Sequence, residues 1–509
     1  MGGVRGIILD SSVLMPSEDG DASGDTVLSA GADSLLRKLR YSGISVGVSH
    51  EPGLSSLKEC RLEEVARTYS CNIFCLSQED DISIEVARIW EDKGGSYIHV
   101  VSNCREEVCR KESGSGSGWL KVIVGSDERK PSNDAEYVVA TRTSSIFIDK
   151  LEELPLLICH LNKEAMGKEA LTVGYVMKPS REEDFAKRGA FPLCPTQNGL
   201  IFLPLNYELP MSSQLQLVDA VLHKATDEIL AVDMHSPSEF SDKVTFTRNL
   251  QELQRYIKDQ TDCCVIDPFN NIFPILDRLE IQKILIGLET LNIQGHGKVR
   301  APHFLKVDSF DDPNLTRRLV EAKLSLPNIV KPQVACGVSD AHSMAIVFNV
   351  DHYKDLNVPL PAVVQEYVDH SSLLYKFYAL GSKIFYAVKK SIPNADTLMN
   401  LFTEKGLKPL HFDSLKSLPV AKEQVIADNH QIDLELVNRA TEWLRRKLDL
   451  TIFGFDVVVQ EGTGDHVIVD VNYLPSFKEV PDDVAVPAFW DALKEKIVSQ
   501  KSKQARTAF

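Results

Sequence analysis

The chain has 509 residues, of which 43% are hydrophobic and 25% are charged, as in ordinary soluble globular proteins. This length predicts about two to four domains with sizeable cores. The net charge of −16 excludes general binding to nucleic acid or to an anionic membrane surface, but it allows a local basic pocket for a small polyanion.

Targeting and redox signals point to the cytoplasm. No apolar run reaches the length of a membrane span, and the start MGGVRG has Gly6 where a myristoylation motif needs Ser or Thr. No secretory peptide precedes the acidic residues. The 10 cysteines are scattered without zinc spacing, which indicates free thiols in a reducing compartment. We expect a cytoplasmic protein without a membrane anchor, and a monomer.

The first part of the chain, residues 1–165, has the pattern of a parallel α/β domain. A buried strand at 4–10 ends in Asp10, a helix follows at 34–39, and a second strand lies at 44–49. Further strands are predicted at 97–101 and 121–124, and polar loops at 16–25 and 112–119.

Strand signals restart after residue 165, so we place a second domain at 166–500 and a basic tail at 501–509. The apolar pattern predicts strands at 171–177 and 263–266 and helices at 274–288, 315–323 and 433–448. The whole chain is therefore expected to be of the α/β class.

Residues 326–348 contain two strand-like ends around a polar middle that includes Gly337. Lys331 ends the first strand, where its ammonium group can reach a nucleotide phosphate. A loop containing Gly337 can close over phosphates and exclude water. The alternatives are a surface lysine and an ordinary polar role for His342.

Residues 363–381 predict a strand, a short polar connection and a second strand. Backbone groups leaving the first strand can pair with the edge of an adenine ring. Lys376 alternates with apolar residues, and Lys383, Lys389 and Lys390 follow it. These lysines form a basic patch suited to phosphates, unless they only line a solvated strand face.

Residues 453–472 predict a β-hairpin, because two runs rich in Val and Ile flank Gly462-Thr463-Gly464. A turn centred on Thr463 places Asp456 opposite Asp470, and Asn472 leaves the same face as Asp470. Opposed carboxylates repel each other, and an all-oxygen cluster suits a hard cation such as Mg²⁺. The alternative is a surface hairpin with solvated acids.

Taken in order, these segments resemble the inositol-tetrakisphosphate 1-kinase family, also called inositol 1,3,4-trisphosphate 5/6-kinases. The resemblance covers about residues 170–490, in six blocks: VGYVMK, IDPFNNIFPILDR, residues 331–348, VVQEYVDHSSLLYK, KKS, and FGFD with VDVN. It implies an ATP-grasp fold, with an N-terminal subdomain at 166–265 and the central and C-terminal subdomains at 266–500. It also implies an ATP- and Mg²⁺-dependent kinase acting on an inositol tris- or tetrakisphosphate.

The resemblance assigns roles residue by residue. The nucleotide-binding positions fall on Arg278, Lys331, Gln365, Glu366, Tyr367, Val368 and Ser391. The positions that grip the inositol phosphate fall on Arg181, His342, Lys376 and Asn472. Asp456 and Asp470 match the ligands of one Mg²⁺, and Asp470 and Asn472 those of a second. Catalysis would then depend on Lys331, Lys376 and His342 through positioning and electrostatics, without a dedicated general base.

The chain departs from the family pattern at several positions near the site. Cys336 precedes Gly337 where the family has His or Asp, Ala341 and Ser343 flank His342, and Ser476 replaces a glycine. A lysine near the start of the family pattern falls on Arg181. These departures leave a second hypothesis, a catalytically weak scaffold that binds inositol phosphates.

The N-terminal domain resembles the haloacid-dehalogenase fold. Asp10 and Ser49 end its first two predicted strands, and Gly125-Ser126-Asp127 with Asp134 is similar to the late acidic motif of that fold. Its phosphatases need a second acid two residues after the nucleophile, where this chain has Ser12. We therefore expect a degenerate, inactive domain. The alternatives are a bifunctional enzyme with phosphatase activity, or any parallel α/β domain that has an acid at a strand end.

Overall fold

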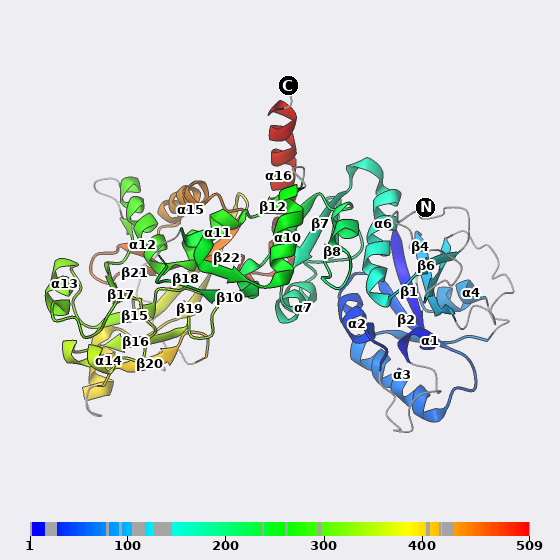
Figure 1. Cartoon of the computed structure of the whole chain (residues 1–509), viewed down its shortest axis with the longest axis horizontal. Helices are drawn as coiled ribbons and strands as arrows, with labels where there is room; N and C mark the ends of the chain where they lie inside the picture. The colour runs from blue at the N-terminus through cyan, green and yellow to red at the C-terminus, as the bar shows by residue number, and fades with distance from the viewer. Residues whose placement is uncertain are drawn as a thin grey trace. The chain divides into compact units, whose positions relative to one another are not determined.

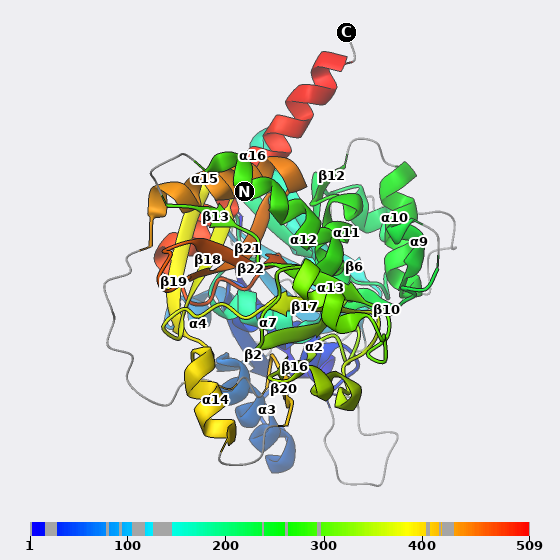
Figure 2. The ribbon, with the colours of Figure 1, turned by 90° about the vertical axis from the view of Figure 1, so that its left-hand side faces the viewer.

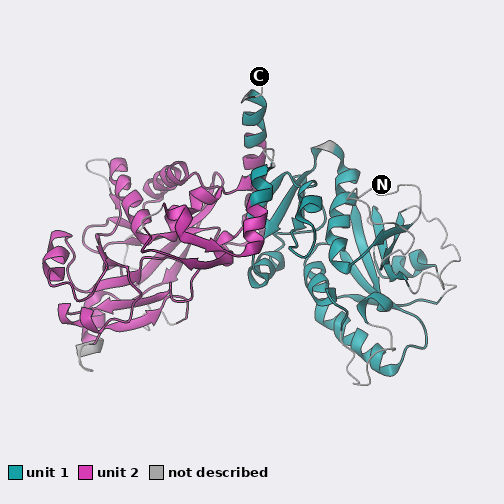
Figure 3. Cartoon of the chain, in the orientation of Figure 1, with its two compact units in different colours: residues 1–222, 255–264, 500–509 teal, residues 223–254, 265–499 magenta. Residues whose placement is uncertain are grey.

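The structure is a computed structural model. It describes residues 3–15, 28–77, 81–90, 94–103, 118–125, 145–236, 239–259, 263–292, 297–403, 408–416, 419 and 432–507. Two compact units are present: residues 1–222, 255–264 and 500–509 form unit 1, and residues 223–254 and 265–499 form unit 2 (Figure 3). Within the described ranges, no helix combines the length and apolar character that crossing a bilayer requires.

Unit 1 begins with a six-stranded sheet in the order β3-β2-β1-β4-β5-β6, in which every neighbouring pair is parallel. Its strands are β1 Val4–Asp10, β2 Ser45–His50, β3 Asn72–Cys75, β4 Ser96–Ser102, β5 Trp119–Val124 and β6 Ser145–Ile148. Its helices are α1 Ser11–Leu14, α2 Ala32–Arg40, α3 Ser56–Tyr69, α4 Ile82–Ala87 and α6 Leu154–Met166. The predicted parallel α/β domain is confirmed (Figure 1, right).

The predicted loops at 16–25 and 112–117, and the acidic motif at 126–127 and 134, lie outside the described residues. Each of the eight cysteines within the described ranges is a free thiol, as the sequence predicts.

A second sheet of four strands has the order β12-β9-β7-β8. Its strands are β7 Leu171–Val176, β8 Leu200–Pro204, β9 Ala220–His223 and β12 Cys264–Ile266. The helices nearby in sequence are α7 Pro179–Lys187, α8 Met211–Leu215 and α10 Arg248–Asp259, and a hairpin is formed by β10 Ile229–Val232 and β11 Val244–Phe246.

Unit 2 contains two five-stranded sheets. Figure 2 labels strands of both. We call them the lysine sheet and the acidic sheet. The lysine sheet has the order β14-β17-β15-β16-β20: β14 Phe304–Val307, β15 Asn328–Pro332, β16 Ser343–Val347, β17 Ala362–Glu366 and β20 Leu410–Asp413. The acidic sheet has the order β13-β22-β21-β18-β19: β13 Val299–Arg300, β18 Leu373–Leu380, β19 Lys383–Lys390, β21 Ile452–Val459 and β22 His466–Tyr473.

Helices complete unit 2. They are α9 Phe240–Lys243, α11 Phe269–Leu276, α12 Arg278–Ile286, α13 Leu315–Glu321, α14 Ala395–Thr403, α15 Leu434–Leu448 and α16 Asp482–Thr507, with 3₁₀ turns at Gly287–Leu291 and Val350–Asp355. Helix α16 runs to Thr507 and so includes residues 501–507 of the expected tail; its residues from 500 onward belong to unit 1. Further 3₁₀ turns lie at Leu151–Glu153, Gly167–Glu169 and Ala225–Glu228.

The single helix predicted at 274–288 is wrong. The chain forms α11 and α12 with a break at Asp277, whose carboxylate accepts hydrogen bonds from the backbone N–H groups of Leu279 and Glu280. Asp277 is therefore the N-cap of α12, a position that favours Asp because it satisfies free N–H donors. Pro274, which suggests a helix start, lies inside α11.

The predicted hairpin is confirmed as β21 and β22, and Asp456 does lie opposite Asp470. The register near the turn differs from the expected one, because Val459 pairs with His466 rather than with Val467. A bulge between Asp456 and Val457 corrects this offset of one residue. Bulges of this kind redirect side chains and are frequent beside functional sites.

Successive side chains along each strand of the acidic sheet leave opposite faces of the sheet. Phe377 of β18 stacks on Phe455 of β21 with ring centroids 5.2 Å apart, and both rings are buried. The residues next to them along the chain, Lys376 and Asp456, therefore leave the opposite face. One face of the sheet builds the core and the other carries charge.

Candidate active site

A row of charged side chains crosses the acidic sheet. Lys376 of β18 lies opposite Asp456 of β21, which lies opposite Asp470 of β22. Directly opposed residues in a sheet leave the same face with their Cβ atoms about 4.5–5.5 Å apart. Asn472, two residues after Asp470, donates a hydrogen bond of 3.0 Å from Nδ2 to Asp470 Oδ2. The structure thus brings together the two carboxylates and the amide that the sequence suggests.

The surroundings of the row raise the pKa of one of its carboxyl groups. Burial and the neighbouring charge of Asp470 raise the pKa of Asp456 to about 7, although Lys376, Lys331 and Lys389 oppose this shift. In the described part of the chain, no three His, Cys, Asp or Glu side chains converge in a metal-like group. The available ligand set is therefore two carboxylates and one amide, all hard oxygen donors.

Lys331 comes to this row from the lysine sheet. It lies on β15 opposite Val363 of β17. Burial lowers the pKa of Lys331 to about 8; the charges of Asp470 and Asp456 raise it, and that of Arg278 lowers it further. The lysine therefore lies within electrostatic reach of both carboxylates, as the sequence prediction requires.

Arg278, the first residue of α12, is buried, and its guanidinium group donates hydrogen bonds to backbone carbonyl oxygens. Its Nη1 donates to the carbonyl oxygens of Pro332 (2.7 Å), Val334 (2.8 Å) and Ala341 (3.1 Å), and its Nη2 to that of Ala335 (3.2 Å). The adjacent Asp277 accepts two hydrogen bonds of 3.0 Å from Gln333 Nε2. Arg278 thus holds the segment that follows Lys331, which we call the 332–341 loop.

The 332–341 loop leads to His342. The ring Nδ1 of His342 is 3.1 Å from Ser414 Oγ, just after β20. Burial and the charge of Arg278 lower the pKa of His342, whereas the charges of Asp413 and Asp470 raise it. His342 is therefore neutral over more of the neutral range than a free imidazole and lies within electrostatic reach of the acidic row.

Gly337 is required by the shape of the 332–341 loop. Its φ is +88°, and a Cβ atom there would lie 2.6 Å from Ile229 Cδ1. Gly462, in the β21–β22 turn, has a φ of +78° but nothing within 4 Å of its Cβ position. A substitution at Gly337 would therefore cause both backbone strain and a steric clash, whereas a substitution at Gly462 would cause backbone strain alone.

We expect Gly337→Ala to lower stability by about 1–3 kcal/mol and to raise the KM for nucleotide, because both strain and clash distort the loop. Gly462→Ala, the matched control, carries only the strain and should leave KM unchanged. Thermal unfolding and initial-rate kinetics check this. Equal effects of the two variants on KM would contradict it.

The segment predicted to contact adenine begins in β17. Gln365 is buried in that strand, between Phe304 of β14 and Ile329 of β15. Tyr367 donates its hydroxyl hydrogen to the carbonyl oxygen of Pro393. A ring N–H of His370 donates to the carbonyl oxygen of Val368 over 2.6 Å.

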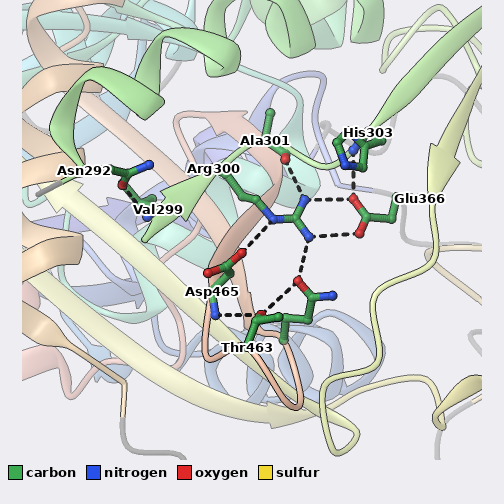
Figure 4. A network of polar contacts seen from close by, with 9 residues as sticks. Asn292, Val299, Arg300, Ala301, His303, Glu366, Thr463 and Asp465 are labelled. Atoms are coloured by element: carbon green, nitrogen blue, oxygen red, sulfur yellow. Dashed lines mark hydrogen bonds and ion pairs between the residues drawn. The ribbon is translucent and has the colours of Figure 1, made fainter. Parts of the chain in front are cut away.

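The side chain of Glu366 is held by a separate network (Figure 4). Arg300 Nη1 and Nη2 bind the Glu366 carboxylate at 2.8 and 2.9 Å, and Arg300 also pairs with Asp465 at 3.3 Å and with Gln460 at 2.8 Å. The N–H of His303 adds a hydrogen bond to Glu366. Glu366 and Arg300 therefore tie β17 to the turn of the β21–β22 hairpin. The N–H of Glu366 also donates to the carbonyl oxygen of His303 over 2.8 Å.

Two predicted residues come from elements other than those that form the row. Ser391 is buried after β19, and its N–H donates to the carbonyl oxygen of Ser372 over 2.7 Å. Arg181 lies on α7 in unit 1, whereas the other predicted site residues are in unit 2.

Sequence reasoning missed Lys224, which follows β9. Its ammonium group donates to the carbonyl oxygen of Tyr473 and lies 4.9 Å from the centre of that ring. Tyr473 is the residue after Asn472, so Lys224 supports the end of β22. A lysine after a four-residue strand has no periodic signal, and its partner is 249 positions away in the chain.

The carboxylate of Asp10 in unit 1 is buried and hydrogen-bonded. It is 1% exposed and accepts hydrogen bonds from the N–H of Ser12 (3.0 Å) and from Ser49 Oγ (2.9 Å). The Oγ of Ser12 in turn accepts a hydrogen bond from the N–H of Ser102. The Asp10 carboxylate is thus held by a serine hydroxyl and a backbone N–H, and Ser12 occupies the position where phosphatase chemistry would need a second acid.

Comparison with known proteins agrees with this arrangement. Residues 1–164 match the family described as "ITPK4, N-terminal HAD-like domain", and residues 293–491 match the inositol 1,3,4-trisphosphate 5/6-kinase ATP-grasp domain. The chain is 47% identical over 504 residues to inositol-tetrakisphosphate 1-kinase 6 of Oryza sativa subsp. japonica, covering 97% of this chain and 90% of the relative.

More distant relatives were also found. Inositol-tetrakisphosphate 1-kinase of Xenopus laevis is 26% identical over 316 residues, which is 61% of this chain and 75% of the relative. Among solved structures, D-alanine–D-alanine ligase from Bacillus anthracis matches with a TM-score of 0.41 and 15% identity, covering 66% of this chain and 100% of that one. The extent and identity of the rice match show that this chain belongs to the inositol-tetrakisphosphate 1-kinase family, as an ATP-grasp kinase with a HAD-like N-terminal domain.

Proposed function

We propose that this protein transfers the γ-phosphoryl group of ATP to a hydroxyl group of an inositol tris- or tetrakisphosphate, in a Mg²⁺-dependent reaction. The observation that carries the proposal is the row of Lys376, Asp456 and Asp470 within electrostatic reach of Lys331 on the facing sheet. Family membership supports the reaction class.

Asp456, Asp470 and Asn472 fit a site for divalent cations. Their oxygens are hard donors. The raised pKa of Asp456 reflects first its burial and then the neighbouring charge of Asp470, and a bound divalent cation would favour the ionised carboxylate. When bound there, Mg²⁺ would neutralise charge that develops on the transferred phosphoryl group. The protein contributes two carboxylates that sheet pairing holds in register.

In this proposal Lys331 binds the ATP phosphates directly, whereas Arg278 acts indirectly, through the loop that follows Lys331. Because its guanidinium group is used by four backbone carbonyl groups, Arg278 shapes the 332–341 loop that would cover the phosphates. The segment from Gln365 to Val368 and Ser391 would contribute to nucleotide binding. We propose that Lys376, His342 and Asn472 hold the inositol phosphate so that one hydroxyl group lies in line with the γ-phosphorus.

We also propose that residues 1–165 are a distinct HAD-like domain without phosphatase activity, because Ser12 stands in place of the second acid. Asp10→Asn should leave both phosphate release and kinase activity unchanged. Malachite-green detection of phosphate from inositol phosphates, without ATP, measures the first. Loss of release in the variant would favour the bifunctional alternative.

The proposed function is tested by incubating the protein with Mg²⁺, radiolabelled ATP and a panel of inositol tris- and tetrakisphosphates, with separation of products against isomer standards. Transfer of label to at least one acceptor is the expected result. Binding of acceptors without transfer would contradict it and favour the scaffold hypothesis.

The lowered pKa of Lys331 predicts a pH dependence of nucleotide binding. Below about pH 8 the side chain of Lys331 is a charged ammonium group. Above that pH the side chain loses its proton in the free protein. ATP can then bind with full affinity only if Lys331 takes up a proton again. The Kd of ATP should therefore rise by up to about tenfold per pH unit above that value. Calorimetry in buffers of different ionisation enthalpy should show proton uptake.

Lys331→Arg is the matched control, because a guanidinium group stays charged throughout this range. Its affinity should be nearly independent of pH. An equally steep pH dependence in Lys331→Arg would show that another group titrates.

A further inference from the structure

Glu479 contacts the charged face of the acidic sheet but has no role in the mechanism above. It lies in the segment between β22 and α16, and its carboxylate pairs with Lys389 of β19 and accepts a hydrogen bond from the Tyr378 hydroxyl of β18. Lys389 lies opposite Leu374, whose side chain leaves the same face as Lys376 two residues on. Glu479 therefore adds a negative charge to the face where Lys376, Asp456 and Asp470 lie.

The fold holds Glu479 in this position. Leu474 and Phe477, in the same segment, have positive φ values of 42° and 34° and are fully buried. The Phe477 ring packs on Phe489 of α16 with centroids 5.6 Å apart. Strained, non-glycine residues of this kind persist only where the surrounding packing imposes them, and they cluster at functional sites.

Lys376 and Lys389 act electrostatically on both Glu479 and Asp456. Burial opposes ionisation of Glu479, but the hydrogen bonds from Lys389 and Tyr378 and the charges of Lys389 and Lys376 outweigh it and hold its pKa at about 2. The charges of Lys376 and Lys389 also act on Asp456. Glu479 is thus a permanent anion at neutral pH, and it cancels one of the two lysine charges on this face.

We propose that Glu479 is a specificity-determining residue: by neutralising Lys389, it weakens the attraction of the site for highly phosphorylated acceptors and favours those with fewer phosphates. This inference rests on the proposed function, since it takes the acceptor to be an inositol polyphosphate bound against this face. A fixed charge acts on a polyanion in proportion to the charge of that polyanion, so each added phosphate should strengthen the discrimination.

Four variants of the full-length protein test this charge balance. The Glu479–Lys389 pair has zero net charge in the wild type, +1 in Glu479→Gln, −1 in Lys389→Gln and zero in the double variant. Glutamine keeps an acceptor for the Tyr378 hydroxyl. Tyr378→Phe is the control, because it removes that hydrogen bond and keeps both charges.

At low ionic strength we expect Glu479→Gln to lower the KM of an inositol tetrakisphosphate by about three- to tenfold, and that of a trisphosphate by less. Lys389→Gln should raise both values, and the double variant and Tyr378→Phe should stay within about twofold of the wild type. Added salt should shrink every difference. Thermal unfolding verifies that each variant is folded.

Equal KM values in Glu479→Gln and the wild type, or a shift that is the same for tris- and tetrakisphosphates, would overturn the inference. So would a Tyr378→Phe variant that reproduces the effect of Glu479→Gln. If the wild type transfers no phosphate, the proposed function fails. Calorimetric binding of a tris- and a tetrakisphosphate to the same variants then still decides the inference by the order of their affinities.

Discussion

Replacing Asp470 with Asn should lower kcat/KM by about a thousandfold, which corresponds to about 4 kcal/mol of lost transition-state stabilisation. Asp470 lies between Asp456 and Asn472 and acts electrostatically on Lys331, so in the proposed mechanism it is the ligand that both metal ions share. Its amide analogue keeps the shape and the hydrogen bond with Asn472 but loses the charge. Initial rates over a range of Mg²⁺ concentrations should show that saturation moves to higher Mg²⁺.

Asp308→Asn is the control for this prediction. Asp308 is exposed and pairs with Lys306 at 2.8 Å on the lysine sheet, and surface pairs of this kind contribute about 0–1 kcal/mol. It should leave kcat/KM unchanged. An Asp470→Asn enzyme within about tenfold of the wild type at saturating Mg²⁺ would contradict the assigned metal site.

Arg278→Met should lower the stability of the protein by about 3–5 kcal/mol, because it leaves buried carbonyl groups of the 332–341 loop without donors. Each unsatisfied buried carbonyl costs about 1–3 kcal/mol, and neighbouring losses are not additive. The KM for ATP should rise as well, since the loop follows Lys331 directly. Thermal unfolding and ATP kinetics measure the two effects.

Arg248→Met is the matched control, because the side chain of Arg248 is 88% exposed and only pairs with Glu252 across one helical turn. It should change the unfolding midpoint by little. A raised KM in Arg278→Met with an unchanged midpoint would instead indicate direct contact between Arg278 and ATP.

Local sequence signals were sufficient to predict the β21–β22 hairpin, which carries the candidate metal ligands. Glycines flank Thr463, and alternating Val and Ile define two strands, so the pairing of Asp456 with Asp470 follows from counting. The bulge beside Asp456 could not be predicted, because the same residues fit either register. The prediction of the pair holds because the bulge cancels the one-residue offset at the turn.

Contacts between distant segments were beyond the reach of sequence patterns. The cap formed by Asp277 was hidden inside an apolar stretch that reads as one helix. The use of Arg278 by backbone carbonyl groups depends on a loop more than fifty residues later, and that of Lys224 on the end of β22. Such partners are set by tertiary packing, which local propensity does not encode.

A crystal structure of the complex with Mg²⁺ and a non-hydrolysable ATP analogue would test the central claim most directly. We expect metal ions within about 2.0–2.1 Å of carboxylate oxygens of Asp456 and Asp470, and the terminal phosphates in contact with Lys331. Phosphates bound away from Lys331, or aspartates without metal ions, would contradict it.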